Sequence, residues 1–177
     1  MTNFIFLTVL FFVGCSQHLV SAKVSKWTSI ASDSTGNFLA GTSSKEGIYL
    51  SKDGGETWAV SAAPKLAWYG VASSSNGQHL AACALGNSIF LSNDYGVNWI
   101  RSQSQFGAWD YLAVMAYLDG QFVAVNSNGA ILYSHDASKW ARQDTGDSLE
   151  GIGYGNGILS VHGRSRPQQY WASCSVL

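Results

Sequence analysis

Three short segments of the chain place a serine, an aspartate and a tryptophan at nearly the same spacing. They read SKDGGETW over residues 51–58, SNDYGVNW over 92–99 and SHDASKW over 134–140. A carboxylate at such a position could act as an acid or base, or it could accept N–H groups within a tight turn. Glycine eases a tight turn and tryptophan supplies a large ring to pack under it, so the pattern favours structural hairpins.

The residues predicted to hold these hairpins recur in the same order, although the third segment has lost one residue and the glycine. They are Ser51, Asp53, Gly55, Trp58, Ser92, Asp94, Gly96, Trp99, Ser134, Asp136 and Trp140. Because it lacks the glycine, we expect the third hairpin to be the least regular.

Two series of tryptophans repeat along the chain with a period of 41 residues. The first series is Trp27, Trp68 and Trp109, and the second is Trp58, Trp99 and Trp140. A repeat of roughly 20 to 50 residues is typical of solenoids, propellers and other arrays. In the clearest copy, residues 68–73, 79–84 and 88–92 predict short strands separated by turns, and a fourth strand begins at Trp99. Four short strands in each period match the blade of a propeller.

The sequence therefore predicts an all-β fold, a β-propeller-like array with three full four-stranded antiparallel blades and a partial fourth, over residues 23–163. The fourth copy begins with YGNGIL at 154–159, which parallels YLDGQF at 117–122, and the pattern then stops. Residues 164–177 are predicted to be an irregular tail, although a tail strand could also complete the fourth blade. Alternatively, the chain could be a fragment that pairs with itself or a partner, or its end could have been altered.

The three aspartate segments resemble the Asp-box, or BNR repeat, whose pattern is S-x-D-x-G-x-T-W. In this sialidase-like superfamily the boxes lie away from the catalytic pocket, which implies a structural role for Asp53, Asp94 and Asp136. The repeat occurs in sialidases, sortilin-type receptors, some glucan hydrolases and photosystem II assembly factors. With its short loops, the chain looks more like the photosystem II assembly-factor type, or another secreted propeller, than like a sialidase. Because enzymes and non-enzymes share the repeat, the resemblance implies a fold but no reaction.

The first tryptophan series marks the candidate binding surface. Inner strands of a propeller begin at the face opposite the hairpins, and aromatic side chains gathered there could bind a sugar or a peptide. These candidate ligand-binding residues are Trp27, Trp68, Tyr69, Trp109 and Tyr111. The alternative is that the rings fill the space between blades, which regular recurrence in a repeat favours. We expect no catalytic residue, metal or cofactor, since the sequence shows neither an arginine cluster nor a zinc-type cysteine pattern.

The charge of the chain indicates its class of partner, and its first residues indicate its compartment. Charged residues make up 12% of the chain and the net charge is −1, which argues against a nucleic-acid partner. An uncharged apolar run at residues 4–14, followed by small residues up to Ala22, predicts a signal peptide over residues 1–22. An uncleaved anchor and a bacterial lipid attachment are the alternatives. Cys83 lies in an apolar strand pattern and is either a buried thiol or the disulfide partner of Cys174.

These features predict a secreted or lumenal, non-catalytic propeller that acts as a binding or assembly module. Its ligand would be a protein or a carbohydrate, and its open blade edges could allow self-association. The alternative is a glycan-binding or glycosidase-like fragment, related to sialidases, without a complete active site.

Overall fold

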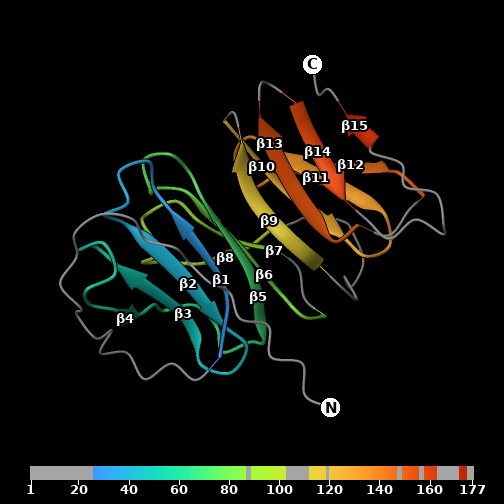
Figure 1. Cartoon of the computed structure of the whole chain (residues 1–177). Helices are drawn as coiled ribbons and strands as arrows, with labels where there is room; N and C mark the ends of the chain where they lie inside the picture. Colours follow the sequence, from blue (N-terminus) through green and yellow to red (C-terminus); the bar gives the residue numbers. More distant parts are fainter. Residues whose placement is uncertain are drawn as a thin grey trace, which may run out of the picture.

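The computed structural model of the protein describes residues 26–86, 89–102, 112–118, 120–146, 149–155, 158–162 and 172–174. Within these ranges the chain forms fifteen strands joined by turns and no helix (Figure 1). Accordingly, none of the described residues belongs to a helix that could cross a membrane. All strand pairs are antiparallel, and the strands follow chain order within each sheet, as expected for successive hairpins.

Three of the four sheets have four strands each, and we call them blades one to three. Blade one contains β1 (Trp27–Ser32), β2 (Leu39–Ser43), β3 (Gly47–Ser51) and β4 (Ala59–Val60). Blade two contains β5 (Trp68–Ser73), β6 (Leu80–Ala84), β7 (Ile89–Ser92) and β8 (Ile100–Arg101). Blade three contains β9 (Leu112–Leu118), β10 (Gln121–Asn126), β11 (Ala130–Ser134) and β12 (Ala141–Asp144).

The fourth sheet has three strands, namely β13 (Gly151–Gly155), β14 (Ile158–His162) and β15 (Ala172–Cys174). The predicted array of three full blades and a partial fourth is therefore confirmed. Tyr154 pairs with Leu159 as Tyr117 pairs with Phe122, so the fourth copy has the register that its sequence indicated. β15 pairs with β14 and comes from the segment 164–177, so the segment predicted as an irregular tail contributes the third strand of this sheet.

Turn chemistry fixes the register of the first hairpin in each of the first two blades. In blade two, Ser73 pairs with Leu80, and between them Gly77 has a φ of 76°, which glycine adopts at little cost. The Ser74 hydroxyl accepts the N–H of His79 at 3.0 Å, and the Ser74 carbonyl accepts the N–H of Gly77 at 2.9 Å. These bonds close the turn and set which side chains face each neighbouring blade.

Blade three departs from this plan. Leu118 of β9 pairs with Gln121 of β10, so a tight turn replaces the longer turns of blades one and two. This turn is shorter than its counterparts, so it does not hold the extra residue of the third copy. The register downstream is unaffected, because Phe122 pairs with Ser134 as Leu80 pairs with Ser92.

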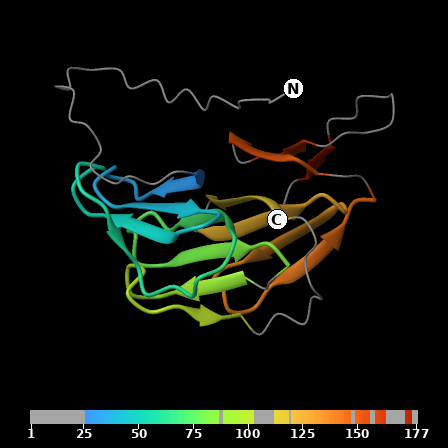
Figure 2. The same ribbon diagram turned by 90° about the horizontal axis from the view of Figure 1, so that it is seen from below.

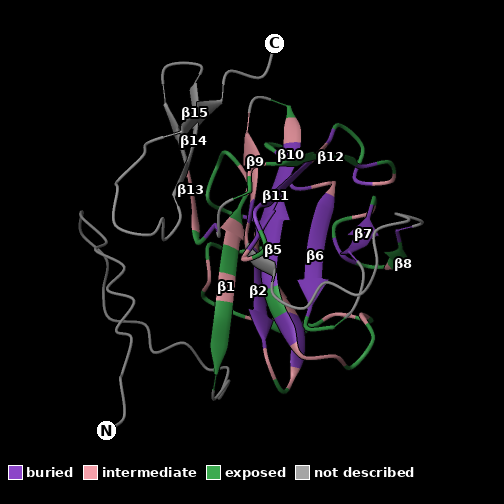
Figure 3. Ribbon diagram, turned by 90° about the vertical axis from the view of Figure 1, so that its right-hand side faces the viewer, coloured by how far each residue is buried: buried purple, intermediate pink, exposed green. Residues whose placement is uncertain are grey.

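The sheets pack face to face in chain order around an arc, from blue through green and yellow to red (Figure 2). Their first strands lie next to one another, since β1 contacts β5, β5 contacts β9 and β9 contacts β13. Blades one and two bury Ala40, Ile48, Trp68, Leu80 and Phe90 between them. Blades two and three bury Cys83, Leu91, Phe122, Leu132 and Trp140. Each central blade thus has two apolar faces, as a stacked repeat requires (Figure 3).

Candidate functional site

The aspartate of the first hairpin is held by its own turn. The Ser51 hydroxyl donates to Asp53 Oδ1 at 2.7 Å, and the N–H of Thr57 donates to the same oxygen at 2.9 Å. The Thr57 hydroxyl donates to Asp53 Oδ2, and the Ser51 hydroxyl accepts the N–H of Gly55 at 2.8 Å. Both carboxylate oxygens are therefore engaged in closing the hairpin, which is the structural role predicted from the sequence.

The second hairpin repeats these contacts with a different donor. Ser92 donates to Asp94 at 2.8 Å, and Asn98 donates to it through its backbone N–H at 2.9 Å and its side-chain amide at 2.7 Å. Asn98, the one departure from the family pattern in this segment, therefore takes the place of a threonine. The amide supplies the donor that the hydroxyl would have supplied.

The third hairpin keeps its carboxylate contacts despite losing a residue. Asp136 accepts the Ser138 hydroxyl at 2.6 Å, the N–H of Ser138 at 2.9 Å and the Ser134 hydroxyl at 3.1 Å. Ala137 has a φ of 57°, in the left-handed region that glycine enters more readily. The irregularity lies in the donors, because Asp136 accepts the N–H groups two and three residues further on, whereas Asp53 and Asp94 accept the N–H four residues further on.

These donors favour the ionised form of each aspartate. The Thr57 hydroxyl and N–H, together with Ser51, lower the pKa of Asp53 from 3.8 to about 2. The N–H and amide of Asn98 lower the pKa of Asp94, and the Ser138 hydroxyl followed by the N–H of Lys139 lowers that of Asp136. A carboxylate with a depressed pKa is a poor general acid near neutral pH, which agrees with a structural role.

The second tryptophan series closes each hairpin from below. The indole N–H of Trp58 donates to the Gly55 carbonyl at 3.0 Å, and that of Trp99 donates to the Gly96 carbonyl at 3.0 Å. Trp140 donates to Ala137 at 2.8 Å. The three equivalent rings thus make the same hydrogen bond three residues back in all three copies.

The first tryptophan series is divided between surface and core. Trp27 is 40% exposed, whereas Trp68 is 0% exposed and donates its indole N–H to the Pro64 carbonyl at 3.0 Å. Trp68 therefore packs between blades one and two and presents no surface to a ligand, which corrects its prediction as a ligand-binding residue. Tyr69 beside it is exposed. Trp109 and Tyr111 lie outside the described residues.

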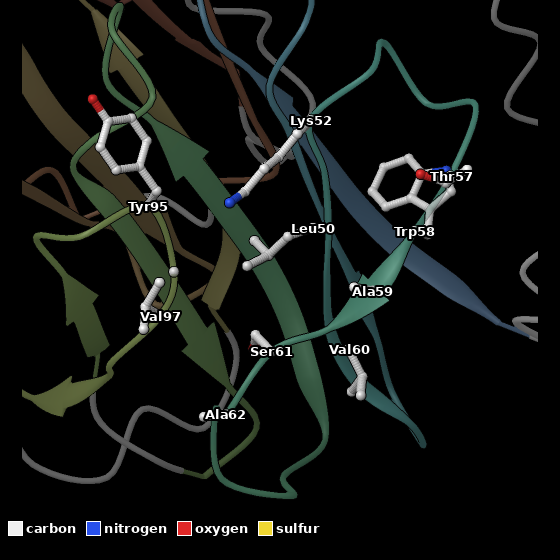
Figure 4. A pocket seen from close by; sticks show the side chains of 11 residues that line it. Leu50, Lys52, Thr57, Trp58, Ala59, Val60, Ser61, Ala62, Tyr95 and Val97 are labelled. Atoms are coloured by element: carbon white, nitrogen blue, oxygen red, sulfur yellow. The ribbon is translucent and has the colours of Figure 1, made fainter.

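An apolar groove lies between the hairpins of blades one and two (Figure 4). Its volume is about 440 Å³, which falls within the range of small-ligand sites. Blade one contributes one wall, and the hairpin of blade two contributes the other. The lining residues are Leu50, Lys52, Thr57, Trp58, Ala59, Val60, Ser61, Ala62, Tyr95, Gly96 and Val97. Lys52 brings the one charged side chain among them, and Figure 4 shows it extending toward the wall that contains Tyr95 and Val97.

The far wall of this groove is held in place by backbone and ring contacts. Tyr95 has a φ of 59°, at the position that is Gly54 in the first hairpin. Its N–H donates to the Gln78 carbonyl at 3.0 Å, and its ring packs edge-on to Phe38 of blade one, with centroids 5.9 Å apart. A bulky residue in the left-handed region is a local strain, and here the surrounding contacts maintain it.

Sequence reasoning placed the candidate ligand site at the first tryptophan series and missed this groove. The groove is formed by the outer strand β4 and two hairpins, and their closeness depends on how blades one and two stack. One feature of the sequence could have indicated the groove. Val60 and Val97 are apolar residues in segments whose sequence pattern predicts exposed positions. Both side chains are indeed exposed, at 64% and 56%.

Cys83 lies in the interface of blades two and three and is a free thiol. Burial raises its pKa to about 12. Of the two alternatives for this residue, the buried thiol is therefore the one observed. Among the described residues, no group of three or more histidine, cysteine or acidic side chains is arranged to hold a metal ion.

No protein-family profile and no curated protein sequence matches this chain. Its similarity to known proteins is structural. The computationally designed Ika4 protein matches with a TM-score of 0.68 and 9% identity, over 93% of this chain and 99% of the designed chain. A structure of YCF48 bound to D1 peptide matches with a TM-score of 0.58 and 13% identity, over 86% of this chain and 56% of that chain.

The nidogen chain of a nidogen/laminin complex also matches, with a TM-score of 0.64 and 15% identity, over 80% of this chain and 57% of that chain. These neighbours are β-propellers, and the stacked four-stranded sheets described above define the same fold in this protein. The chain spans little more than half the length of the YCF48 and nidogen chains. At such low identity the likeness concerns the fold alone.

Proposed function

We propose that the protein is a non-catalytic Asp-box propeller that acts as a binding or assembly module for a protein partner. The observation that carries the proposal is the apolar groove between the hairpins of blades one and two. Soluble proteins rarely leave clustered apolar side chains in a concave surface unless something binds there. Here Val60, Tyr95 and Val97 remain exposed along the groove.

The shape and chemistry of the groove favour an extended peptide segment. β4 is the outermost strand of its sheet, so a peptide lying along it can add main-chain hydrogen bonds. The apolar side chains would hold alternate residues of the peptide, and Lys52 would favour a carboxylate on it. Among the structural neighbours, YCF48 was seen with a bound D1 peptide and nidogen in complex with laminin, so a propeller of this kind can bind polypeptides.

The contacts of the hairpin carboxylates support both the Asp-box assignment and the non-catalytic assignment. Asp53, Asp94 and Asp136 each accept hydrogen bonds from their own turn, and each hairpin ends in an indole bonded to its backbone. These residues hold the hairpins that form the groove walls. Their role is to position the groove, and the binding chemistry belongs to the side chains between them.

Peptides selected from a random display library on the immobilised protein provide the test, with affinity measured by calorimetry. Val97→Asp places a charge in the groove, and we expect it to weaken a selected peptide by about tenfold or more, which corresponds to about 1.4 kcal/mol. Ile100→Asp is the matched control, because Ile100 is 63% exposed on the outer strand of blade two and does not line the groove. Equal peptide affinities for the two variants would mean that the groove is not the peptide-binding site.

A glycan-binding function is the second candidate, and the exposure of Trp27 favours it. The ring of Trp27 lies 5.0 Å from that of Trp58 and 5.5 Å from that of Tyr49, which forms an aromatic surface of the kind on which sugars stack. The same library experiment run beside a glycan array separates the candidates. The carbohydrate alternative would be favoured if no peptide is selected and if the protein binds a glycan that Trp27→Ala no longer binds. Hydrolysis of a fluorogenic sialoside above the blank would contradict the non-catalytic assignment.

A further inference from the structure

The side of blade one that points away from blade two carries a set of apolar residues, which we call the outer face. It consists of Trp27, Ile30, Leu39, Gly41, Tyr49 and Trp58. Their neighbours in sequence, such as Ala31, Ala40 and Ile48, pack toward blade two. Since successive strand residues point to opposite sides of a sheet, the outer-face residues point the other way. Figure 3 shows the contrast, with β1 largely exposed and β5 and β6 buried.

The repeat identifies the counterparts of these residues in blade two. Trp27 corresponds to Trp68, which is 0% exposed against 40% for Trp27. Ile30 corresponds to Val71, and here the exposures are 50% and 1%. The same positions of the same structural unit are therefore covered in blade two and uncovered in blade one. Among the described residues, no element covers the outer face, although blade one covers the equivalent face of blade two.

The cover over blade two shows what kind of surface fits such a face. It is the side of another blade, which presents Phe38, Ala40 and Ile48 to Trp68 and its neighbours. Polar contacts join the inner strands as well, because the Thr28 hydroxyl donates to the Trp68 carbonyl at 2.9 Å. The fitting partner is therefore a β-sheet with small and branched apolar side chains, stacked face to face.

The side chains of the outer face are arranged for such stacking. Trp27 lies flat over β2, since a Cβ added at Gly41 would come within 2.3 Å of its ring. The rings of Trp58 and Tyr49 pack against it. Tyr49 stands where blade two has the apolar Phe90, so the outer face has one more hydroxyl than its covered counterpart. A flat aromatic surface with a polar atom suits an interface that is sometimes exposed to water.

We propose that a second copy of this chain docks on the outer face and that two chains stack into one longer array. At the other end of the array, β13 packs against β9 and, within the described part of the chain, does not pack closely against β1. Each copy therefore offers one open blade at either end, and two head-to-tail contacts would close a pair of copies into a ring. The YCF48 and nidogen chains that match are nearly twice as long as the portion this chain covers, so a second copy supplies a comparable share of a propeller.

The test is the mass of the purified protein by sedimentation velocity and light scattering over a range of concentrations. We expect twice the mass of one chain at high concentration. Ile30→Lys adds a charge to the outer face at a half-exposed position, so it should leave the fold intact and return the mass to that of one chain. Ile100→Lys, at a similarly exposed position on blade two, should keep the double mass.

Hydrogen–deuterium exchange of the unmodified protein keeps the proposal testable if Ile30→Lys fails to fold. Protection of β1 and β2 should rise with protein concentration, and that of the groove wall on blade two, Tyr95 to Val97, should not. A protein that stays at the mass of one chain at every concentration overturns the proposal. So does a dimer that survives Ile30→Lys, or one whose protection rises in the groove instead of on β1. The groove variant Val97→Asp separates this result from the peptide-binding function, since Val97 lines the groove from the hairpin of blade two and its replacement should not affect the mass.

Discussion

In each hairpin a single aspartate carboxylate accepts the hydrogen bonds that close the turn. Asp53 ties together the start and the end of its turn through Ser51 and Thr57, and Asp94 does so through Asn98. The bonds require the ionised form, which accepts hydrogen bonds at both oxygens. Protonation removes acceptors at all three hairpins, so stability depends on pH through this shared feature.

Acid should destabilise the protein between about pH 4 and pH 2. The pKa of Asp53 falls from 3.8 to about 2 on folding, so the unfolded chain binds protons first as the pH drops. The stability from this group is fully present above pH 4 to 5 and is lost toward the folded pKa. Asp53→Asn should lower proton uptake on unfolding by about one and flatten the acid decline in urea midpoints. An unchanged decline in both Asp53→Asn and Asp94→Asn would contradict this assignment.

For the strands, the interfaces between blades determine how much each of two equivalent residues contributes to stability. β1 and β5 have the same length and the same bulge between their first and third residues. They differ in what covers them, since β5 lies between two blades, whereas the described strands that contact β1 from another blade lie on one side of it. The same side chain therefore contributes differently to stability in the two strands.

Tryptophan truncation in these two strands should separate their contributions. Trp68→Ala removes a fully buried ring between blades, and we expect it to lower the free energy of unfolding by about 3–5 kcal/mol. Trp27→Ala removes a ring that is 40% exposed, and the loss should stay below about 2 kcal/mol. Urea unfolding followed by circular dichroism measures both. Equal losses would mean that Trp27 is covered as fully as Trp68 in solution.

Much of the fold could be predicted because residues that recur within the repeat determine where the hairpins lie and how the strands pair. The recurrence of serine, aspartate and tryptophan predicted the hairpins, and the parallel between the third and fourth copies predicted the pairing of Tyr154 with Leu159. Local hydrogen bonds fix these features, so local sequence is enough to predict them. The strand β15 had no such signal, because its three residues carry no hairpin motif and owe their place to pairing with β14.

The candidate site was less predictable because it depends on contacts between copies. Trp27 and Trp68 occupy the same place in the repeat, and only the stacking of blades makes one exposed and the other buried. The groove likewise joins residues of two hairpins whose closeness no single repeat encodes. Tyr95 falls at an unspecified position of the S-x-D-x-G-x-T-W pattern, yet its ring packs against Phe38 of the preceding blade.

For the whole molecule, the compartment is a proposal that rests on the first 22 residues. The apolar run at residues 4–14 and the small residues before Lys23 predict removal of a leader and secretion. Expression in a secreting host should give a protein in the medium whose intact mass and first residue correspond to a start at Lys23. A product that stays with the membrane and retains residues 1–22 would favour an uncleaved anchor.

The third copy gains a residue before its second strand and loses one within its hairpin, and Trp140 returns to the common period. Phe122 and Ser134 pair as their counterparts do, and the indole of Trp140 makes the same backbone bond. Length is therefore the same where a ring must meet its hairpin and differs at the turn between β9 and β10, which is shorter than its counterparts in blades one and two. Insertions engineered into that turn should be tolerated, so it is the natural place to attach a tag or a fluorescent label without disturbing the stack.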